Sequence, residues 1–196
     1  MADPLPRFVS LEVAKVELGL PPGPDPDPDN PNTDEILGRL LDYCTKKFQD
    51  KAGWPIFSGN QIHRIDGGFR TDLWPAATPI TAVNSLTDWG VPILPADGSS
   101  SGYEFDADRV WLVSGTFSEG KQNVALNYVG GYAADAIPGD IVEVNIEQMR
   151  YMWLRRMNIA QASQSLAGQS VPWERVPLIP RFLECAEAYS NKAWMG

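Results

Sequence analysis

The chain is poor in the residues from which most metal and acid–base sites are built. Among its 196 residues there is one histidine, His63, and there are two cysteines, Cys44 and Cys185. A single histidine excludes metal clusters and catalytic dyads that need several, and His63 lies in a predicted strand without a partner nucleophile, so we interpret it as structural. The two cysteines fall in separate predicted helices and lack metal-ligand spacing. They indicate an intracellular, reducing origin rather than a disulfide framework.

Positive charge and long apolar runs are also scarce. The chain has 16 Lys and Arg against 25 Asp and Glu, which gives a net charge of -9 and a pI near 4.6. This balance argues against a general nucleic-acid binder, which would need a basic patch. No run approaches the ~18 apolar residues of a membrane span, and the sequence does not begin with an apolar signal region. We therefore expect a soluble protein that is made in a cytoplasm and contacts no membrane.

The acidic residues leave one alternative in which the protein is an enzyme, either a small hydrolase or a metal-dependent enzyme. Such an enzyme would use four aspartates, Asp66, Asp72, Asp106 and Asp108. The last two resemble a fragment of a calcium loop, but the required glycine and terminal glutamate are missing, and Asp-Ala-Asp is a common turn. No glycine pair is followed by a phosphate-binding lysine, and no serine lies in a G-x-S-x-G context. The sequence therefore predicts no catalytic residue, no cofactor and no metal site, and the enzyme stays as the alternative.

Hydrophobic periodicity divides the chain into helices and a β region. Apolar residues at helical spacing predict four helices, over residues 11–18, 33–51, 138–157 and 181–194. Alternating apolar residues between Gly- and Pro-rich turns predict short antiparallel strands over residues 56–129. The predicted fold class is therefore α+β, a small helical bundle with an inserted antiparallel β region and extended arms.

The best-defined stretch is a strand, a loop and a helix over residues 123–157. Val124, Leu126 and Tyr128 alternate with less apolar residues, as in a strand with one buried face. Pro138 suits the first turn of a helix, where its missing N–H would have had no partner. Two neighbouring apolar stripes follow: Ile141, Val144, Gln148 and Met152, and beside them Val142, Ile146, Met149, Trp153 and Met157. We expect this wide apolar face to lie in the core.

Two segments outside these elements are expected to be extended. Residues 21–32 hold six prolines and three aspartates, a composition that excludes helix and sheet and favours a spacer over an arm. Residues 161–170 are small and polar and would act as a hinge. We therefore expect a core over residues 1–160 and a C-terminal hinge and arm over residues 161–196.

The C-terminal arm contains four candidate partner-binding residues. Trp173, Arg175, Arg181 and Trp194 lie in the nearly neutral last third of this acidic chain. Tryptophan and arginine are the residue types in which protein interfaces are enriched. The alternative is that the arm folds back and buries its tryptophans on its own domain.

The order of these elements resembles that of the head–tail connector, or adaptor and head-completion, proteins of tailed bacteriophages. The resemblance covers roughly residues 10–160, and none of its motifs is catalytic. It is carried by the helix D-E-I-L-G-R-L-L-D-Y-C, the strand pair around L-W-P-A-A-T-P-I-T-A-V-N-S-L, the strand N-V-A-L-N-Y-V-G-G-Y and the helix that begins I-P-G-D-I.

The resemblance implies a structural virion protein rather than an enzyme. Such proteins form a homo-oligomeric ring, commonly of twelve subunits, in the neck between head and tail. The ring would bind the portal protein and a tail or neck completion protein and would extend or seal the DNA channel. DNA would pass without specific binding, since an acidic wall repels phosphates. The four arm residues named above would then contact the portal. A tail terminator or another tail or neck protein remains the alternative.

Overall fold

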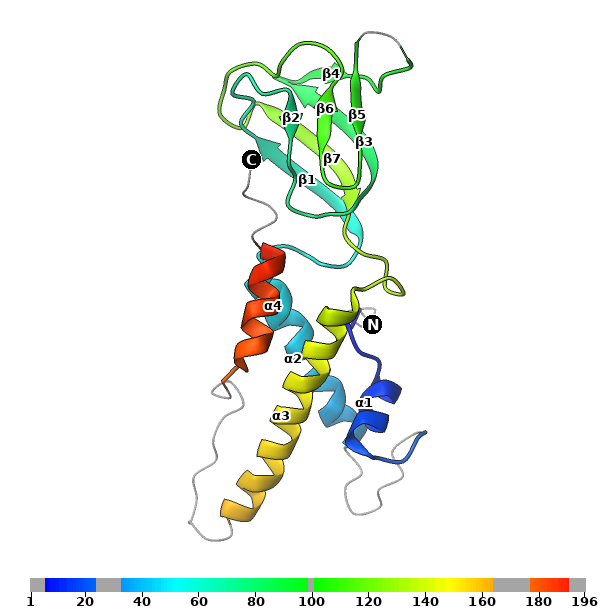
Figure 1. The fold of residues 1–196 in the computed structure, drawn as a ribbon, viewed down its shortest axis with the longest axis vertical. Helices are drawn as coiled ribbons and strands as arrows, with labels where there is room; N and C mark the ends of the chain where they lie inside the picture. The colour runs from blue at the N-terminus through cyan, green and yellow to red at the C-terminus, as the bar shows by residue number, and fades with distance from the viewer. Residues whose placement is uncertain (1–5, 24–32, 99–100, 164–176, 191–196) are drawn as a thin grey trace. The chain divides into compact units, whose positions relative to one another are not determined.

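The structure is a computed structural model that describes residues 6–23, 33–98, 101–163 and 177–190, with the backbone alone for residues 156–163 (Figure 1). The chain divides into two compact units. A helical unit comprises residues 1–52 and 137–189, and a β unit comprises residues 53–136 with 190–196. Within the described ranges there are four helices and two antiparallel sheets. The predicted α+β class, a helical bundle with an inserted β region, is therefore confirmed.

The helices of the helical unit lie where the periodicity places them. They are α1 Leu11–Leu18, α2 Thr33–Ala52, α3 Gly139–Ser163 and α4 Pro180–Ser190. The Ser10 side chain caps α1 by accepting a hydrogen bond from the Val13 N–H, at 3.2 Å. Helix α3 continues six residues beyond the predicted end at 157, so it includes the first residues of the predicted hinge. The rest of that hinge, residues 164–170, and residues 191–194 of the predicted last helix lie outside the described residues.

The core of the helical unit is built around Phe48 of α2, which is fully buried. Its ring makes edge contacts with Phe8 at 5.4 Å, Phe182 at 5.5 Å and Tyr189 at 6.1 Å between ring centroids. Helix α3 buries the side chains Ile141, Val144, Asn145, Gln148, Met149, Met152 and Trp153. Of the nine residues predicted for the wide apolar face, six are buried, Val142 and Ile146 are half-buried, and the side chain of Met157 lies outside the described residues. The buried Asn145 was not predicted to be part of it. No helix in the described ranges is long and apolar enough to cross a membrane.

Helix α4 packs against the rest of the helical unit. Phe182 and Ala186 are fully buried, and the Gln148 side-chain oxygen accepts a hydrogen bond from the Ile179 N–H just before the helix, at 2.9 Å. At the other end, the Tyr189 hydroxyl donates to the Asp140 carboxylate at 2.9 Å. Part of the segment predicted to be an arm is thus folded into the core. Residues 179–189 pack on the protein's own helices, whereas both tryptophans of the predicted arm lie outside the described residues. The two interpretations of the arm therefore stay predictions.

A buried ion pair closes the N-terminal part of the same unit. The side chain of Lys15 in α1 is 2% exposed, and its ammonium lies 2.5 Å from an Asp34 carboxylate oxygen of α2. The same ammonium donates to the backbone carbonyl of Gly23. The Lys15 side chain therefore contacts one residue near the start of the Pro- and Asp-rich segment, Gly23, and one just after its end, Asp34. Residues 24–32 of that segment lie outside the described residues.

We predict that replacing Met149 or Trp153 of α3 by alanine lowers the free energy of unfolding by about 2–5 kcal/mol, because each change leaves a cavity in the core. Met149 is 0% and Trp153 is 9% exposed. Leu154 on the same helix is 59% exposed and provides the control, with an expected loss of about 0.5 kcal/mol or less. Chemical denaturation of the three variants measures the difference. Equal losses at positions 153 and 154 would contradict the core assignment.

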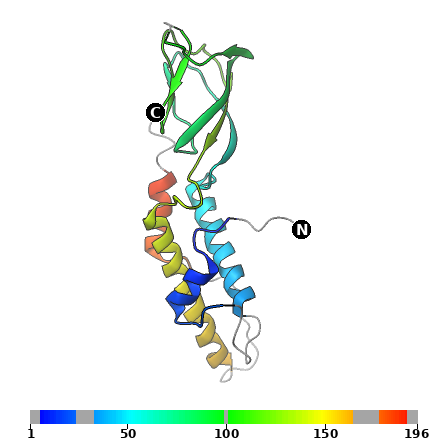
Figure 2. The same cartoon turned by 90° about the vertical axis from the view of Figure 1, so that its right-hand side faces the viewer.

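The β unit contains two sheets that pack as two layers (Figures 1 and 2). The larger sheet has the strand order β1-β7-β3-β4 and the smaller one has the order β2-β6-β5. The strands are β1 Gly59–Ile65, β2 Asp72–Leu73, β3 Ile80–Asp88, β4 Val91–Ile93, β5 Tyr103–Phe105, β6 Val110–Leu112 and β7 Val124–Gly130. The strand β4 was not predicted, because Pro92 at its centre argues against a strand. Pro92 is tolerated there because β4 is an edge strand.

Both sheets contribute buried side chains to one core between the layers. From the larger sheet these include Leu86, Leu126 and Tyr128, and from the smaller sheet Leu73 and Val110, all at most 1% exposed. The alternating side chains therefore point outward from each layer, in opposite directions. The β unit thus presents two outer sheet faces.

Candidate functional site

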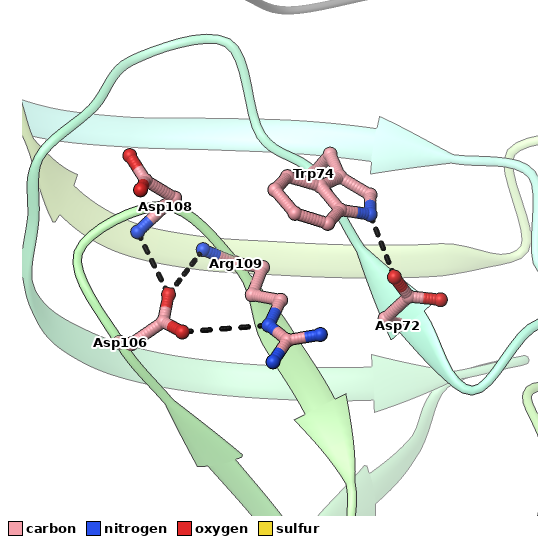
Figure 3. A network of polar contacts seen from close by, with 5 residues as sticks. All are labelled: Asp72, Trp74, Asp106, Asp108 and Arg109. Carbon is pink, nitrogen blue, oxygen red and sulfur yellow. Dashed lines mark hydrogen bonds and ion pairs between the residues drawn. The ribbon is translucent and has the colours of Figure 1, made fainter. Parts of the chain in front are cut away.

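The outer face of the smaller sheet carries two tryptophans that both lie close to one arginine, Arg109. Figure 3 shows Arg109 together with one of them, Trp74. The register places Asp72 opposite Trp111 and Trp111 opposite Glu104, so these three residues share one face. Trp74 and Arg109 lie two residues from Asp72 and Trp111 on the same face. We call this set, Asp72, Trp74, Glu104, Arg109 and Trp111, the tryptophan face.

The Arg109 guanidinium lies within cation–π distance of both indoles of the tryptophan face. The central carbon of its guanidinium lies 5.0 Å from the ring centroid of Trp111 and 5.7 Å from that of Trp74. Both distances fit cation–π interactions, which hold a cation over the negative face of an aromatic ring. Trp74 is 39% exposed, and its indole N–H donates to Asp72 at 2.6 Å. Trp74 is therefore held by a hydrogen bond and remains accessible to a partner, and Trp111 beside it is half-buried.

Asp106 and Asp108 form a turn beside the tryptophan face rather than a cation site (Figure 3). One Asp106 oxygen accepts hydrogen bonds from the backbone N–H groups of Asp108 and Arg109, at 2.8 and 2.9 Å. The other pairs with the Arg109 side chain at 3.4 Å. The Asp108 N–H and the Arg109 groups lower the pKa of the Asp106 carboxyl below its usual value, against a smaller opposing effect of partial burial. The interpretation of Asp-Ala-Asp as a turn is confirmed.

The four aspartates of the enzyme alternative do not converge on one point. Asp72, Asp106 and Asp108 lie around the tryptophan face, whereas Asp66 accepts a hydrogen bond from the Gln122 N–H at 2.6 Å in a different loop region. Three of the carboxylates, Asp66, Asp72 and Asp106, are occupied by local hydrogen bonds. In the part of the chain that the structure describes, no group of three or more His, Cys, Asp or Glu residues is arranged to hold a metal ion.

The outer face of the larger sheet is almost uncharged. The register places the following residues on it: Asn60, Ile62 and Arg64 of β1, Ala82, Ser85 and Thr87 of β3, and Ala125, Asn127 and Val129 of β7. Asn84 lies at an irregularity of β3, and its side chain reaches the same face. The Asn84 amide joins the three strands by donating to the side-chain oxygens of Asn60 at 2.7 Å and Asn127 at 3.3 Å. Ile62 is 68% exposed on the edge strand β1 of this surface. We call these ten residues the asparagine face.

A third surface lies at the end of the β unit where three loops meet. Asn123 is 6% exposed and joins them, since it accepts from the Gly67 N–H at 2.9 Å and donates to Asp88 at 2.7 Å and to the Ser118 carbonyl at 3.0 Å. Two aromatic side chains, Phe69 and Trp89, are 64% and 66% exposed on these loops. Their φ angles of 58° and 49° lie in the left-handed region, which is costly for bulky residues.

His63 is a structural residue on the inner face of β1, as the sequence analysis interpreted it. Its Nδ1 atom lies 3.4 Å from the Tyr128 hydroxyl, which itself accepts a hydrogen bond from the Ala77 N–H at 3.1 Å. Partial burial lowers the pKa of His63, and burial raises the pKa of Tyr128 to about 12. Both groups are therefore neutral at physiological pH, which suits a packed sheet interior.

We predict that the free energy of unfolding decreases as the pH falls below about 6.5, the ordinary pKa of histidine. The folded protein holds the pKa of His63 below 6.5, so the unfolded chain binds the proton more readily. The stabilisation is therefore complete above pH 6.5 and is lost as the pH falls toward the folded pKa. Because His63 is the only histidine, a His63→Gln variant should remove most of this dependence. Melting temperatures between about pH 7.5 and about pH 5.5 test this, and equal slopes for the two proteins would contradict it.

Of the four residues predicted to bind a partner, the structure describes Arg181. Its guanidinium pairs with Glu143 of α3 at 3.0 Å and also with Glu147, and its side chain is 52% exposed. Trp173, Arg175 and Trp194 lie outside the described residues, so a docking role for this group stays a prediction. The sequence analysis did not find the tryptophan face. The sequence does contain a pattern that indicates it. Asp72 and Trp74, and likewise Arg109 and Trp111, are two residues apart, which places each pair on one face of a strand.

Comparison with known proteins identifies the fold. No protein-family model matches the chain, and no curated protein is similar to it in sequence. A chain in the neck of an empty gene transfer agent (GTA) particle, computed with C6 symmetry, is similar over 95% of this chain and 92% of its own length, with a TM-score of 0.53 and 12% identity. A chain of the virion of the native GTA particle matches over 91% and 88%, with a TM-score of 0.52 and 13% identity.

A third similar chain belongs to the neck of the native GTA particle computed with C12 symmetry. It matches over 79% of this chain and 81% of its own length, with 12% identity and a TM-score of 0.46. At these identities the likeness is one of fold, and it extends over both the helical and the β unit for the first of the three structures. The resemblance to neck proteins inferred from the sequence is confirmed at the level of the fold.

Proposed function

We propose that the protein is a structural component of a virion neck, where it forms a ring that connects the portal of the DNA-filled head to the tail and extends or seals the DNA channel. The observation that carries this proposal is the fold shared with a neck chain of the GTA particle over 95% of the present chain. The order of the sequence elements, which resembles that of head–tail connector proteins, supports the same function.

The surface of the β unit supports assembly into a larger structure. Large apolar side chains are exposed there at eight positions: Ile62, Phe69, Trp74, Trp89, Val91, Leu94, Phe105 and Val113. Exposed apolar groups concentrated in one unit are typical of surfaces that bind other proteins. Three of the four carboxylates that an enzyme would need, Asp66, Asp72 and Asp106, are engaged in hydrogen bonds within the β unit, which supports a non-enzymatic function.

Acidic charge supports a ring through which DNA passes without binding. The net charge of -9 would make a channel wall built from many copies repel the phosphate backbone, so that DNA slides rather than adheres. A ring of twelve copies is the expectation from the sequence resemblance. We further propose that Trp173, Arg175, Arg181 and Trp194 contact the portal. For Arg181 this is compatible with its half-exposed ion pairs to α3.

The mass of the assembled protein tests the proposed function. Native mass spectrometry or light scattering is applied to the purified chain alone and after mixing with portal rings of its own particle. We expect a complex in which many copies of the chain bind one portal ring. A chain that stays monomeric both alone and on portals would contradict the proposal. Binding to the end of the tail tube instead of the portal would support the tail terminator.

A further inference from the structure

The two outer faces of the β unit have complementary charge. The asparagine face has one charged residue, Arg64, at an exposed position of β1. On the tryptophan face, Asp72 and Glu104 flank Trp111 from the two neighbouring strands. The single cation of that face, Arg109, is already paired with Asp106. A cation from another molecule would therefore find two carboxylates beside an aromatic ring, a favourable setting for a guanidinium.

The two faces are also complementary in polarity. The amides of the asparagine face are held in place by hydrogen bonds between Asn60, Asn84 and Asn127. Ile62 is exposed beside them and would be covered by an apolar ring. The tryptophan face supplies such rings in Trp74 and Trp111, both of which lie within cation–π distance of Arg109. Tryptophan and arginine are the residue types that dominate the energy of protein interfaces.

The position of the faces determines what kind of assembly they can make. They lie on the two outer sides of one double-layered unit, so one molecule cannot bring its own two faces together. When the asparagine face of one copy binds the tryptophan face of the next, copies inside the row use both faces. The row as a whole still has one free face at each end. Contacts of this head-to-tail kind generate a closed ring if the rotation between copies is right.

We infer that neighbouring copies of this chain bind through their β units, with the asparagine face of one copy on the tryptophan face of the next. Arg64 of one copy then lies against Asp72 and Glu104 of its neighbour, and Ile62 lies against Trp74 or Trp111. This inference rests on the proposed function, because it names the lateral contact of the proposed ring.

Cross-linking between the two faces tests the contact directly. Cys185 is replaced by serine, and Cys44 can remain because it is 1% exposed and burial raises its pKa to about 12. Arg64→Cys and Glu104→Cys are then introduced together in the full chain, and a short bismaleimide is added. We expect a ladder of covalent oligomers longer than dimers. Each single cysteine variant should stay monomeric under the same conditions, because the contact joins different faces. Dimers from a single variant would instead indicate a two-fold contact.

Charge reversal tests the role of Arg64. Arg64→Glu should weaken self-association by about tenfold or more, because it places like charges together. Lys121→Glu is the matched control, since it changes the charge equally at an exposed position of a loop outside both faces. We expect it to leave association unchanged. Adding Glu104→Lys to Arg64→Glu should restore part of the association. Circular dichroism and melting temperature verify that each variant is folded.

The outcomes separate this inference from the proposed function. Suppose that the wild-type chain assembles, alone or on portals, but that the cross-linked ladder is missing and Arg64→Glu assembles like the wild type. The inferred contact is then wrong, and the proposed ring is not contradicted. If the wild-type chain assembles in neither setting, both are wrong. A ladder together with the loss and partial recovery of association establishes the contact.

Discussion

Replacing Phe48 by alanine is expected to lower the free energy of unfolding of the helical unit by about 3–5 kcal/mol. Phe48 is fully buried and its ring touches Phe8, Phe182 and Tyr189. These three partners come from the N-terminal segment and from both ends of α4, so one ring joins regions far apart in the sequence. Alanine would leave a cavity and would also remove the edge-to-face contacts, each worth about 0.5–1.5 kcal/mol beyond burial.

Phe69→Ala is the matched control for this prediction. It removes the same atoms from a ring that is 64% exposed, and its expected effect is within about 0.5 kcal/mol. Urea denaturation followed by far-ultraviolet circular dichroism measures both variants. Phe48→Leu, which retains most of the apolar volume, should lie between Phe48→Ala and the wild type. Similar losses for Phe48→Ala and Phe69→Ala would show that the helical core is not organised around Phe48.

Replacing Lys15 by methionine is expected to cost about 3 kcal/mol, at the lower end of the range for breaking a buried ion pair. The Lys15 side chain is 2% exposed, and that of its partner Asp34 is 25% exposed. Methionine fills a similar volume but leaves the Asp34 carboxylate and the Gly23 carbonyl without the ammonium that both of them contact. The loss arises from these polar groups rather than from a cavity.

The exposed ion pair of α2 provides the control for Lys15. Lys46 lies 3.1 Å from Asp50, with side chains 71% and 48% exposed, so Lys46→Met should cost no more than about 0.5 kcal/mol. A double variant, Lys15→Met with Asp34→Leu, should recover part of the stability because it also removes the Asp34 carboxylate, which Lys15→Met alone leaves without its ion-pair partner. Thermal unfolding of the four proteins measures these differences. If the two lysine variants melt at the same temperature, the buried pair does not stabilise the fold.

The helices and most strands could be predicted from the sequence because their signals are local. Phe48 lies on the same face of α2 as Leu37, Leu41 and Cys44, and helical spacing alone reveals that. The alternation of Val124, Leu126 and Tyr128 likewise identifies the buried face of β7, with all three at 0% exposure. Spacing even placed the polar Gln148 in an apolar stripe, and the structure buries it fully.

Other features could not be predicted because they depend on contacts between distant residues. Gln148 accepts its hydrogen bond from Ile179, which follows 31 residues later, and periodicity does not reveal such a partner. The packing of Phe182 and Tyr189 on Phe48 likewise joins residues more than 130 positions apart, which helical spacing within one segment does not reveal. The tryptophan face depends in the same way on the pairing of Asp72 with Trp111, a register that no local pattern determines.

The ammonium of Lys15 has a practical consequence for labelling this protein. Gly23 and Asp34 stand on the two sides of residues 24–32 in the sequence, and both contact that one ammonium. When the two ends of a loop are held together, each doubling of its length adds only ~0.6 kcal/mol of closure entropy. An epitope inserted after Asp27 should therefore leave the helical unit folded. In electron micrographs, an antibody fragment bound to that epitope would then reveal the position of the N-terminal helices on an assembled particle.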